Sequence, residues 1–366
     1  MSRSIVSRPA GGVLLVGNLP EPPLVGGVEV GVEMILASGL PARHGMRLFN
    51  TARRRDPSRP LRARLAYQGR RFVELAREIL RMRPRLVHVK ATVGVNYWQG
   101  AGYCALARLL GRRVLLQLHG GDFDAWYQAH GRLGRLAVRA ALRVASEVLV
   151  LSQYWRAFVT ELGARRVRVV PNGVRVAEAL PRPAAARPVL QVLTLGSLGE
   201  RKGHFEILEA AARLAGRPIR FVFAGTDEFG GEGDRLRAEA ARLGVSDRVV
   251  FAGAVTGREK WNLLADSDVF LLPSRGENMP NAVLEAMAAG LPVVCTPVGA
   301  LREMLEDGAL FVPVGDAAAI AEAVLRLLVS PTTRDAMGQR NRERAAARFS
   351  FTAVADVLDG IYAESA

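Results

Sequence analysis

Two glutamates eight residues apart lie in a segment whose residue types could bind a phosphorylated ligand. Glu277 and Glu285 stand in Ser274–Thr296, SRGENMPNAVLEAMAAGLPVVCT. A helix is expected to begin near Pro280, because proline is favoured at the first helical position. The amides that would then point out of the helix start, where the helix dipole favours anions, are those of Met279, Asn281 and Ala282. Carboxylates beside such a site are best used to accept hydrogen bonds from ribose or sugar hydroxyls. The structural alternative is that Glu277 caps the helix and Glu285 lies on the surface.

Two adjacent cations form the second candidate cluster. Arg201 and Lys202 occur in Leu195–His204, LGSLGERKGH, at the expected start of a helix that follows a strand and a glycine-bearing turn. Fixed cations beside helix amides suit a diphosphate leaving group. Of the 50 basic residues three are lysines, Lys90, Lys202 and Lys260, and 47 are arginines. We therefore expect position 202 to require a compact ammonium group. The alternative is a pair of solvated basic residues at a turn.

Short apolar runs alternate with helix-length segments from end to end. This alternation is typical of parallel sheets covered by helices on both faces, so the predicted fold class is α/β with two Rossmann-like domains. The strands predicted in the first half are Val13–Gly17, Met46–Asn50, Leu86–Lys90, Val114–His119, Glu147–Ser152 and Val167–Val170. Those predicted in the second half are Val189–Leu195, Ile219–Gly225, Val249–Gly253, Val269–Ser274, Pro292–Thr296 and Leu310–Val314.

The chain of 366 residues is long enough for two domains. The stretch Ala177–Pro188, AEALPRPAAARP, lacks helical periodicity and is predicted to link residues 1–176 to residues 189–350. Ligands of open parallel sheets bind beyond the carboxyl ends of the strands. Two such sheets facing a central cleft would therefore place the site in that cleft.

The composition argues against several classes of protein. Hydrophobic residues make up 49% of the chain and charged residues 23%, which suits folded domains. No apolar run approaches the roughly 20 residues that a membrane-spanning helix needs. No apolar stretch follows Arg3 and Arg8 as it would in a secretion signal. Cys104 and Cys295 are far apart in apolar segments, so neither a disulfide framework nor a zinc site is expected. Such cysteine usage suits a reducing cytosol.

The net charge of +15 is concentrated in one region. Residues 43–85 hold 14 arginines against three acidic residues, Asp56, Glu74 and Glu78. Such a surface attracts phosphate backbones, acidic lipid head groups or a charged acceptor, unless it is simply a solvated helix face. Residues 63–83 are predicted to form a helix. Its apolar side, expected to pack on the sheet, carries Leu65, Phe72, Leu75 and Ile79. The arginine-rich face and the loop Arg53–Arg64 would then contact acidic lipid.

Several motifs together resemble the retaining glycosyltransferases of family 4, which have the GT-B fold. They are Arg201–Lys202–Gly203, the frame E-x7-E from Glu277 to Glu285, and the trailing EAMAAGLPVVCT. The resemblance extends over nearly the whole chain. Further motifs follow in the expected order, namely Gly26–Gly27 after the first strand, His119–Gly120 after a central strand, Pro171–Val174, and Asp268 before VFLLPS.

The resemblance implies a role for each matching residue. Arg201 and Lys202 would hold the diphosphate, Glu285 the ribose hydroxyls, and Glu277 hydroxyls of the donor sugar. The remaining residues that it places around the substrate are Gly26, Gly27, His119, Asn172, Asn278 and Met279. Gly27 would let the backbone approach the phosphates, because a Cβ would intrude there. Two departures from the family are Asn278, where glycine is usual and where asparagine would tolerate left-handed backbone geometry, and Arg175, where aspartate is common.

The mechanism that the resemblance implies needs no metal and no cofactor. Cations and helix amides would stabilise the departing diphosphate in place of a metal ion. The departing phosphate oxygen would take the proton of the acceptor, so that no protein base is required. The family also implies that the last helix, residues 351–366, crosses back to the N-terminal domain.

The function predicted is transfer of a sugar from a nucleotide-diphosphate donor to a glycan or lipid-linked acceptor, in polysaccharide or glycolipid biosynthesis. A cytoplasmic location, with peripheral attachment to the inner face of the cell membrane, accompanies it. Two alternatives stay open: a nucleotide-sugar 2-epimerase of the same fold and a nucleic-acid-binding protein. Nucleic acid is not the expected partner, because Tyr67 and Phe72 are the only aromatic residues within the arginine-rich helix. Neither the donor's base and sugar nor the acceptor can be read from these motifs.

Overall fold

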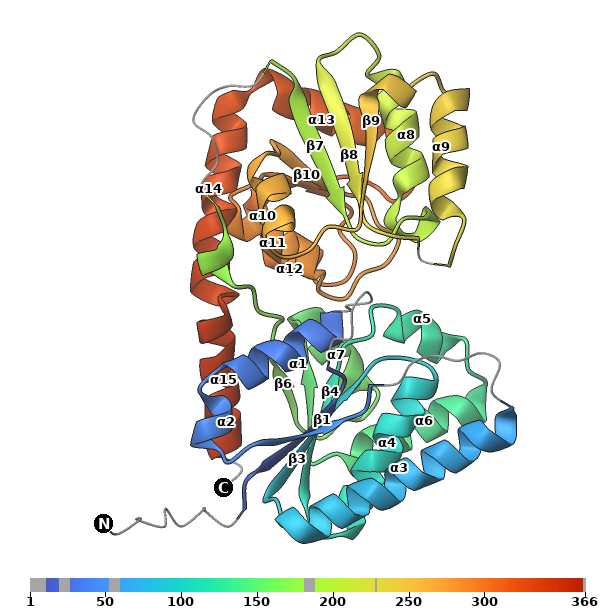
Figure 1. Cartoon of the computed structure of the whole chain (residues 1–366), viewed down its shortest axis with the longest axis vertical. Coiled ribbons are helices and arrows are strands. Elements are labelled where there is room, and N and C mark those ends of the chain that lie inside the picture. Colours follow the sequence, from blue (N-terminus) through green and yellow to red (C-terminus); the bar gives the residue numbers. More distant parts are fainter. Residues whose placement is uncertain (1–10, 20–26, 53–59, 181–187, 228, 365–366) are drawn as a thin grey trace. The chain divides into compact units, whose positions relative to one another are not determined.

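The computed structural model describes residues 11–19, 27–52, 60–180, 188–227 and 229–364. The chain forms two compact units (Figure 1). Unit 1 comprises Met1–Pro171 and Val354–Ala366, and unit 2 is the continuous segment Asn172–Ala353. Each unit contains a sheet of six parallel strands flanked by helices.

The sheet of unit 1 has the strand order β2-β1-β3-β4-β5-β6. Its strands are β1 (Val13–Gly17), β2 (Arg47–Asn50), β3 (Leu86–Ala91), β4 (Arg113–Leu118), β5 (Glu147–Val150) and β6 (Val167–Val169). Its helices are α1 (Gly27–Ala37), α2 (Leu40–Arg43), α3 (Leu61–Met82), α4 (Val95–Leu109), α5 (Phe123–Gln128), α6 (Arg132–Val144), α7 (Gln153–Glu161) and the greater part of α15 (Phe351–Ala363). The order reverses direction between β1 and β3, and such a reversal opens a crevice at the carboxyl ends of the two strands.

The sheet of unit 2 has the strand order β12-β11-β10-β7-β8-β9. Its strands are β7 (Leu190–Leu195), β8 (Ile219–Ala224), β9 (Val249–Gly253), β10 (Val269–Leu272), β11 (Val293–Cys295) and β12 (Ala309–Phe311). Its α-helices are α8 (His204–Arg213), α9 (Glu232–Arg242), α10 (Gly257–Ala265), α11 (Asn281–Ala288), α12 (Leu301–Leu305), α13 (Ala317–Val329) and α14 (Pro331–Arg348). Short 3-10 turns are η1 (Val176–Glu178), η2 (Glu200–Lys202), η3 (Ser246–Arg248) and η4 (Glu306–Gly308). Here the order reverses between the neighbours β7 and β10.

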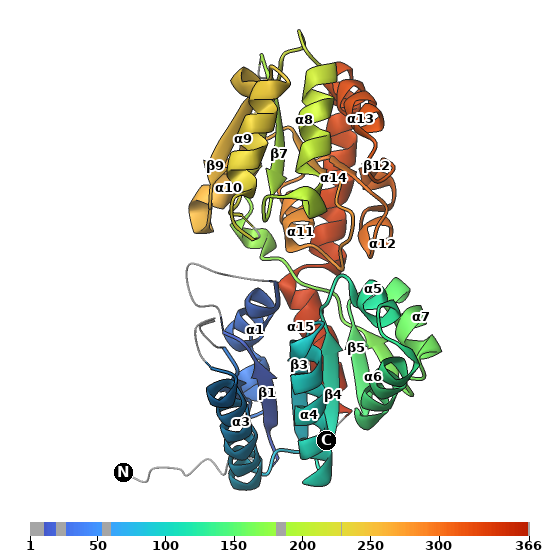
Figure 2. The same ribbon diagram turned by 90° about the vertical axis from the view of Figure 1, so that its right-hand side faces the viewer.

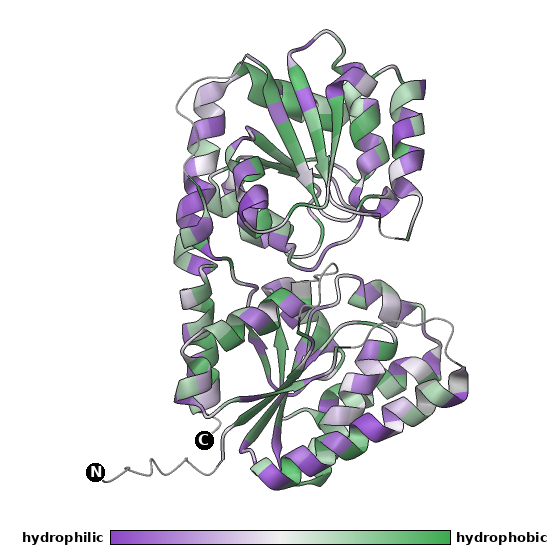
Figure 3. Cartoon of the chain, in the orientation of Figure 1, coloured by the Kyte–Doolittle hydropathy of each residue, from purple (hydrophilic) through white to green (hydrophobic). Residues whose placement is uncertain are grey.

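The strands are apolar along their length because helices cover both faces of each sheet. The inner strands β1, β3, β5 and β10 are buried along their whole length. Figure 3 shows the same contrast, with mainly hydrophobic strands and helices that carry a hydrophilic side. The predicted α/β class and all twelve predicted strands are confirmed.

Some predicted strands end earlier than expected, for local reasons. The strand β10 stops at Leu272, because Pro273 has no N–H to continue the ladder. Similarly, β5 stops at Val150, and Ser152 instead caps α7 by accepting a hydrogen bond from the Trp155 amide at 3.4 Å. The strand β4 stops at Leu118, so that His119 is the first residue beyond it.

The final helix α15 contributes to the core of unit 1. Val354, Leu358 and Ile361 recur at helical spacing and are buried. They pack in one cluster with strand residues that include Leu15, Leu86, Leu115 and Leu149. Figure 2 shows α15 beside the strands of this sheet. In the described part of the chain, no helix is both long enough and apolar enough to cross a membrane.

Candidate active site

The predicted donor-binding residues of unit 2 come from the loops that follow β7 and β10. These two strands are hydrogen-bonded neighbours at the point where the strand order reverses. Loops at such a point diverge to opposite sides of the sheet and leave room for a ligand between them. Arg201 and Lys202 lie on the first loop, and Glu277 lies on the second. The topology therefore brings together two segments that are about 75 residues apart in the sequence.

The first loop is shaped by a close approach of backbone segments. Arg201 and Lys202 lie in the 3-10 turn η2, not in the helix start itself; α8 begins two residues after Lys202, at His204. A Cβ on Gly203 would lie 2.4 Å from the carbonyl oxygen of Pro273, and φ at Gly203 is +77°. Only glycine fits this position. The amide of Arg275 donates to the carbonyl of Arg201 at 2.9 Å, which joins the two loops directly.

The ammonium of Lys202 is ion-paired with the carboxylate of Glu277. The same carboxylate oxygen, Oε1, accepts a hydrogen bond from the Ser274 hydroxyl at 2.7 Å. The side chains of Lys202 and Glu277 are 12% and 8% exposed, so that a charged pair is held at the edge of the sheet with little water around it. Arg201 is close by and lies 3.5 Å from the hydroxyl of Ser197 through Nη2. Cations and a carboxylate are thus preorganised on one site.

The second loop continues through Asn278 and Met279 into α11. Asn172 donates through Nδ2 to the carbonyl of Met279 at 2.9 Å, and its amide lies 3.1 Å from the Met279 sulfur. Asn172 is therefore a support of this loop. Asn278 is buried, and its carbonyl accepts a hydrogen bond from the Ala300 amide at 2.9 Å. A Cβ on Gly299 would lie 2.0 Å from the Glu277 carbonyl, so the turn before α12 braces the loop from behind.

One expectation about this loop was wrong, and another is confirmed. Among the described residues, positive φ outside glycine occurs at Arg83 and Glu306 alone, so Asn278 does not adopt the left-handed conformation that asparagine was expected to tolerate there. The helix does begin near Pro280: this residue is the N-cap of α11, with an extended ψ of 122°, and Asn281 is the first helical residue. Its carbonyl accepts from the amides of Val283 and Leu284 at 3.1 and 3.3 Å. The amides of Asn281 and Ala282 therefore have no acceptor within the helix, as is usual for the first amides of a helix.

Glu285 lies one helical turn beyond the start of α11 and is paired with a residue that the sequence did not single out as a site residue. Its Oε1 is 2.5 Å from Nζ of Lys260 on α10. Burial raises the pKa of Glu285, and the Lys260 ammonium opposes that rise. Next to Lys260, the indole Nε1 of Trp261 donates to Glu178 Oε2 at 3.0 Å. The scarcity of lysine was the one available signal, because all three lysines touch a predicted site residue.

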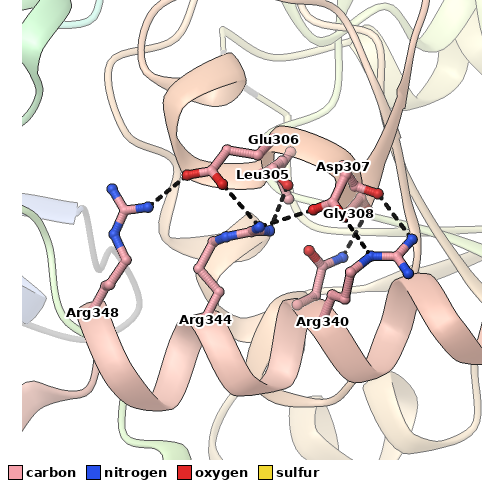
Figure 4. Close-up of polar contacts among 8 residues, drawn as sticks. Leu305, Glu306, Asp307, Gly308, Arg340, Arg344 and Arg348 are labelled. Carbon is pink, nitrogen blue, oxygen red and sulfur yellow. Dashed lines mark hydrogen bonds and ion pairs between the residues drawn. The ribbon is translucent and has the colours of Figure 1, made fainter.

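The 3-10 turn η4, which follows α12, is anchored by arginines of α14 (Figure 4). Arg340 and Arg344 pair with Asp307 at 2.9 Å, and Arg348 pairs with Glu306 at 2.7 Å. The three arginines are four residues apart, so they lie on one face of the helix. Glu306 has a φ of +50°, which is unfavourable for a residue with a Cβ. The ion pairs hold η4 in that turn directly behind α12.

In unit 1 the predicted site residue His119 follows the end of β4. Its amide donates to the carbonyl of Ala91 at 2.8 Å, and its Nε2 lies 3.4 Å from Nζ of Lys90 on β3. Burial lowers the pKa of Lys90 to about 7. Burial and the nearby Lys90 charge lower the pKa of His119 well below its usual value, so the imidazole is neutral. Gly27 begins α1, and Gly26 lies outside the described residues.

Among the described residues, no three histidine, cysteine, aspartate or glutamate side chains group as a metal-binding set. The two cysteines are free and buried, and burial raises the pKa of the Cys104 thiol to about 12. Neither thiol is therefore a nucleophile at neutral pH.

Comparison with known families assigns both halves of the chain. Residues 14–173 match the model of the glycosyl transferase 4-like domain. Residues 182–344 match the model of glycosyl transferases group 1. The two matches together account for most of both units.

Individual relatives have related activities. The chain is 35% identical over 207 residues to the lipopolysaccharide core biosynthesis glycosyltransferase LpsE of Rhizobium meliloti, covering 54% of this chain and 58% of that protein. It is 28% identical over 319 residues to the alpha-D-kanosaminyltransferase of Streptomyces kanamyceticus, covering 78% and 81%. It is 31% identical over 260 residues to the phosphatidyl-myo-inositol mannosyltransferase of Mycobacterium leprae, covering 69% and 64%. The chain thus matches less than two thirds of the length of the first and third of these proteins.

Solved structures show the same fold. Sucrose-phosphate synthase from Thermosynechococcus elongatus superposes with a TM-score of 0.79 at 22% identity, covering 96% of this chain and 98% of that one. HepE of Anabaena in complex with UDP and glucose superposes with a TM-score of 0.76 at 17% identity, covering 96% and 99%. The predicted GT-B fold is confirmed by these likenesses.

Proposed function

This chain belongs to the family 4 glycosyltransferases of the GT-B fold, and we propose that it is a retaining enzyme that transfers a sugar from a nucleotide-diphosphate donor to a glycan or lipid-linked acceptor. The observation that carries the proposal is the ion pair between Lys202 and Glu277, with Arg201 beside it, at the strand reversal of unit 2. Cations and a hydroxyl-binding carboxylate in one place are what a sugar diphosphate requires.

Each part of the donor has a partner in this arrangement. The diphosphate would lie against Arg201 and Lys202 and against the first amides of α11. Glu277, which Lys202 and Ser274 keep fixed, would accept hydrogen bonds from hydroxyls of the transferred sugar. Glu285 would accept from the ribose hydroxyls. In unit 1, His119 is a neutral imidazole, so it would act as a hydrogen-bonding group and not as a charge.

The chemical step follows from where charge develops. The bond between the anomeric carbon and the diphosphate oxygen breaks, which leaves positive charge on the sugar ring and an additional negative charge on the diphosphate. Arg201 and Lys202 would stabilise the diphosphate in the transition state more than in the ground state. The acceptor hydroxyl attacks the same face of the sugar, and its proton passes to the departing phosphate oxygen. The products are a glycoside of unchanged anomeric configuration and a nucleoside diphosphate.

No metal ion is required by this scheme. A divalent cation in other transferases neutralises the departing diphosphate, and here two fixed side-chain cations and helix amides would do so. Lys202 is already ion-paired with Glu277, so this cation would be in place before the donor arrives.

We propose that the acceptor is membrane-proximal and that the enzyme works at the cytoplasmic face, because the exposed arginines of α3 would favour contact with acidic lipid. The predicted apolar side of this helix is confirmed for Leu75 and Ile79, which are fully buried, and for Phe72, which packs against the same core. The exposed arginines among the described residues of α3 are Arg62, Arg70, Arg77 and Arg81, and its C-cap Arg83 is exposed as well. Most of the predicted basic loop, residues 53–59, lies outside the described residues. Exposed arginines attract acidic lipid head groups by about 1 kcal/mol each.

A panel of UDP-, GDP- and ADP-sugars tests the donor assignment by thermal shift, because a ligand that binds the folded state raises its melting temperature. One nucleotide class is expected to raise it, and the same donor should then be consumed only when an acceptor is supplied. Conversion of a nucleotide sugar without any acceptor would instead support the epimerase alternative. Salt-sensitive DNA binding without any shift by nucleotide sugars would support a nucleic-acid-binding protein.

A further inference from the structure

Lys260 is the ion-pair partner of Glu285, the carboxylate that the proposed function assigns to the ribose. It lies on α10, one helix away in the sequence from Glu285 on α11, and the two side chains are 24% and 16% exposed. The pair joins Lys260 Nζ to Glu285 Oε1 at 2.5 Å. Within the described part of the chain, the side-chain hydrogen bonding of Glu285 involves this one oxygen, so Oε2 can accept another hydrogen bond.

The surroundings of Glu285 would make it a poor hydrogen-bond acceptor without this lysine. Burial raises the pKa of Glu285, and the carboxylate of Glu178 raises it further. Glu178 cannot easily turn away, because its Oε2 is held by the Trp261 indole at 3.0 Å. A glutamate that takes up a proton loses the acceptor capacity that two ribose hydroxyls require. The Lys260 ammonium is the group that opposes protonation.

We propose that Lys260 is a positioning residue of the nucleotide site: its ammonium holds Oε1 of Glu285 so that the other carboxylate oxygen, Oε2, is turned toward the ribose hydroxyls. This inference depends on the proposed function, because it takes the ligand to be a nucleoside diphosphate. It adds a determinant of ribose recognition that neither the E-x7-E frame nor the Arg201–Lys202 pair contains.

The residue type supports this role. Of the 50 basic residues, 47 are arginines, yet this position holds one of the three lysines. An arginine guanidinium tends to bind a carboxylate through two parallel hydrogen bonds and would engage both oxygens of Glu285. A lysine ammonium acts as a compact charge and can bind one oxygen while the other stays available.

The test measures binding of the nucleoside diphosphate that the donor panel selects, and of its 2′-deoxy analogue, by calorimetry between pH 5.5 and 8. The variants are Lys260→Met, Lys260→Arg and Glu285→Gln. Arg258→Met serves as the control, because Arg258 is an exposed cation on the same helix and its loss changes the net charge equally. Thermal melting of each variant checks that it is folded.

The wild-type protein should prefer the ribonucleotide by about tenfold or more, and the preference should fall to about threefold or less in Lys260→Met and Glu285→Gln. Without the ammonium the pKa of Glu285 rises, so ribonucleotide binding by Lys260→Met should weaken as the pH falls, from a higher pH than in wild type. Lys260→Arg should not restore the preference, and Arg258→Met should leave it unchanged.

A wild-type ribose preference and pH profile in Lys260→Met would overturn the inference while leaving the proposed function intact. Absence of nucleoside diphosphate binding by the wild-type protein would instead refute the proposed function, and the inference with it.

Discussion

The phenol of Tyr362 is hydrogen-bonded to Nδ1 of His88 at 2.7 Å, although 274 residues separate them. Tyr362 belongs to α15 and His88 to β3, and both side chains are fully buried in unit 1. Burial lowers the pKa of His88 to about 3 and raises the pKa of Tyr362, so both groups are neutral across the range in which the protein would work. This bond fixes the register of the last helix on the sheet.

Tyr362→Phe should therefore destabilise unit 1 by about 1–3 kcal/mol, because it leaves a buried imidazole nitrogen without its partner. Urea unfolding followed by a probe in unit 1 measures the loss. Tyr154→Phe is the matched control, since the Tyr154 hydroxyl also bonds a side chain, Asp124, but at the surface. Equal stability of the two variants would show that the buried bond contributes nothing.

Removal of the donor-site charges should abolish turnover without unfolding the chain. Lys202→Ala is expected to lower kcat/KM by about 10²–10³, because a buried transition-state charge loses its partner. Glu285→Ala should act mainly on KM for the donor. Arg242→Ala, which removes an exposed ion pair with Glu239, is the control and should leave activity unchanged. Near-normal kcat/KM values for both site variants would show that the site is wrongly assigned.

Chelation should not affect the reaction. Full activity is expected in excess EDTA, since Arg201, Lys202 and the amides at the start of α11 act on the diphosphate. Steady-state rates with and without EDTA, after dialysis against the chelator, make the comparison. Activity that disappears on chelation and returns with Mg²⁺ or Mn²⁺ would contradict the mechanism.

Lys90→Met should stabilise the protein in a pH-dependent manner. The pKa of Lys90 is about 7 in the folded state and about 10.4 when unfolded, so the unfolded chain binds the extra proton between these values. The stability contributed by this site therefore rises as the pH increases from 7 to 10.4 and is lowest below pH 7. The variant should exceed wild type by roughly 4 kcal/mol at pH 6 and by much less at pH 9.5. A constant difference at the two values would exclude a shifted lysine.

Acidic liposomes should bind the protein at low salt and release it at high salt. Co-sedimentation measures this, with neutral vesicles as the reference. Arg77→Gln combined with Arg81→Gln on α3 should weaken binding by roughly 2 kcal/mol. The pair Arg237→Gln and Arg242→Gln on α9 of unit 2 is the charge-matched control. Equal, negligible sedimentation under every condition would rule out the membrane and leave a free acidic acceptor to account for the charge.

The sequence predicted the sheets well because their signal is local. A strand buried on both faces, such as Leu86–Ala91, must be apolar along its length, and that pattern is visible without any knowledge of its neighbours. The limits of each strand depended on single residues such as Pro273, whose effect is also local. The predicted Arg201, Lys202 and Glu277 do lie together, since the loops that carry them follow adjacent strands.

The pairs that tune the site could not be predicted in the same way. Lys260 meets Glu285 through the packing of two helices, and Asn172 meets Met279 across 107 residues. No spacing rule connects such positions, because their contact is decided by how the helices and loops pack. The rarity of lysine was a compositional hint, but it did not identify the partner.

The division of unit 1 between Met1–Pro171 and Val354–Ala366 also determines the order in which the chain can fold during translation. Unit 2 is continuous and can complete its core once residue 353 has been made. Until then Leu15, Leu115 and Leu149 lack the helix that covers them. At about 5–20 residues per second, the 182 residues between the two parts of unit 1 take roughly 10–40 s to synthesise. The half that leaves the ribosome first is therefore the last to be finished.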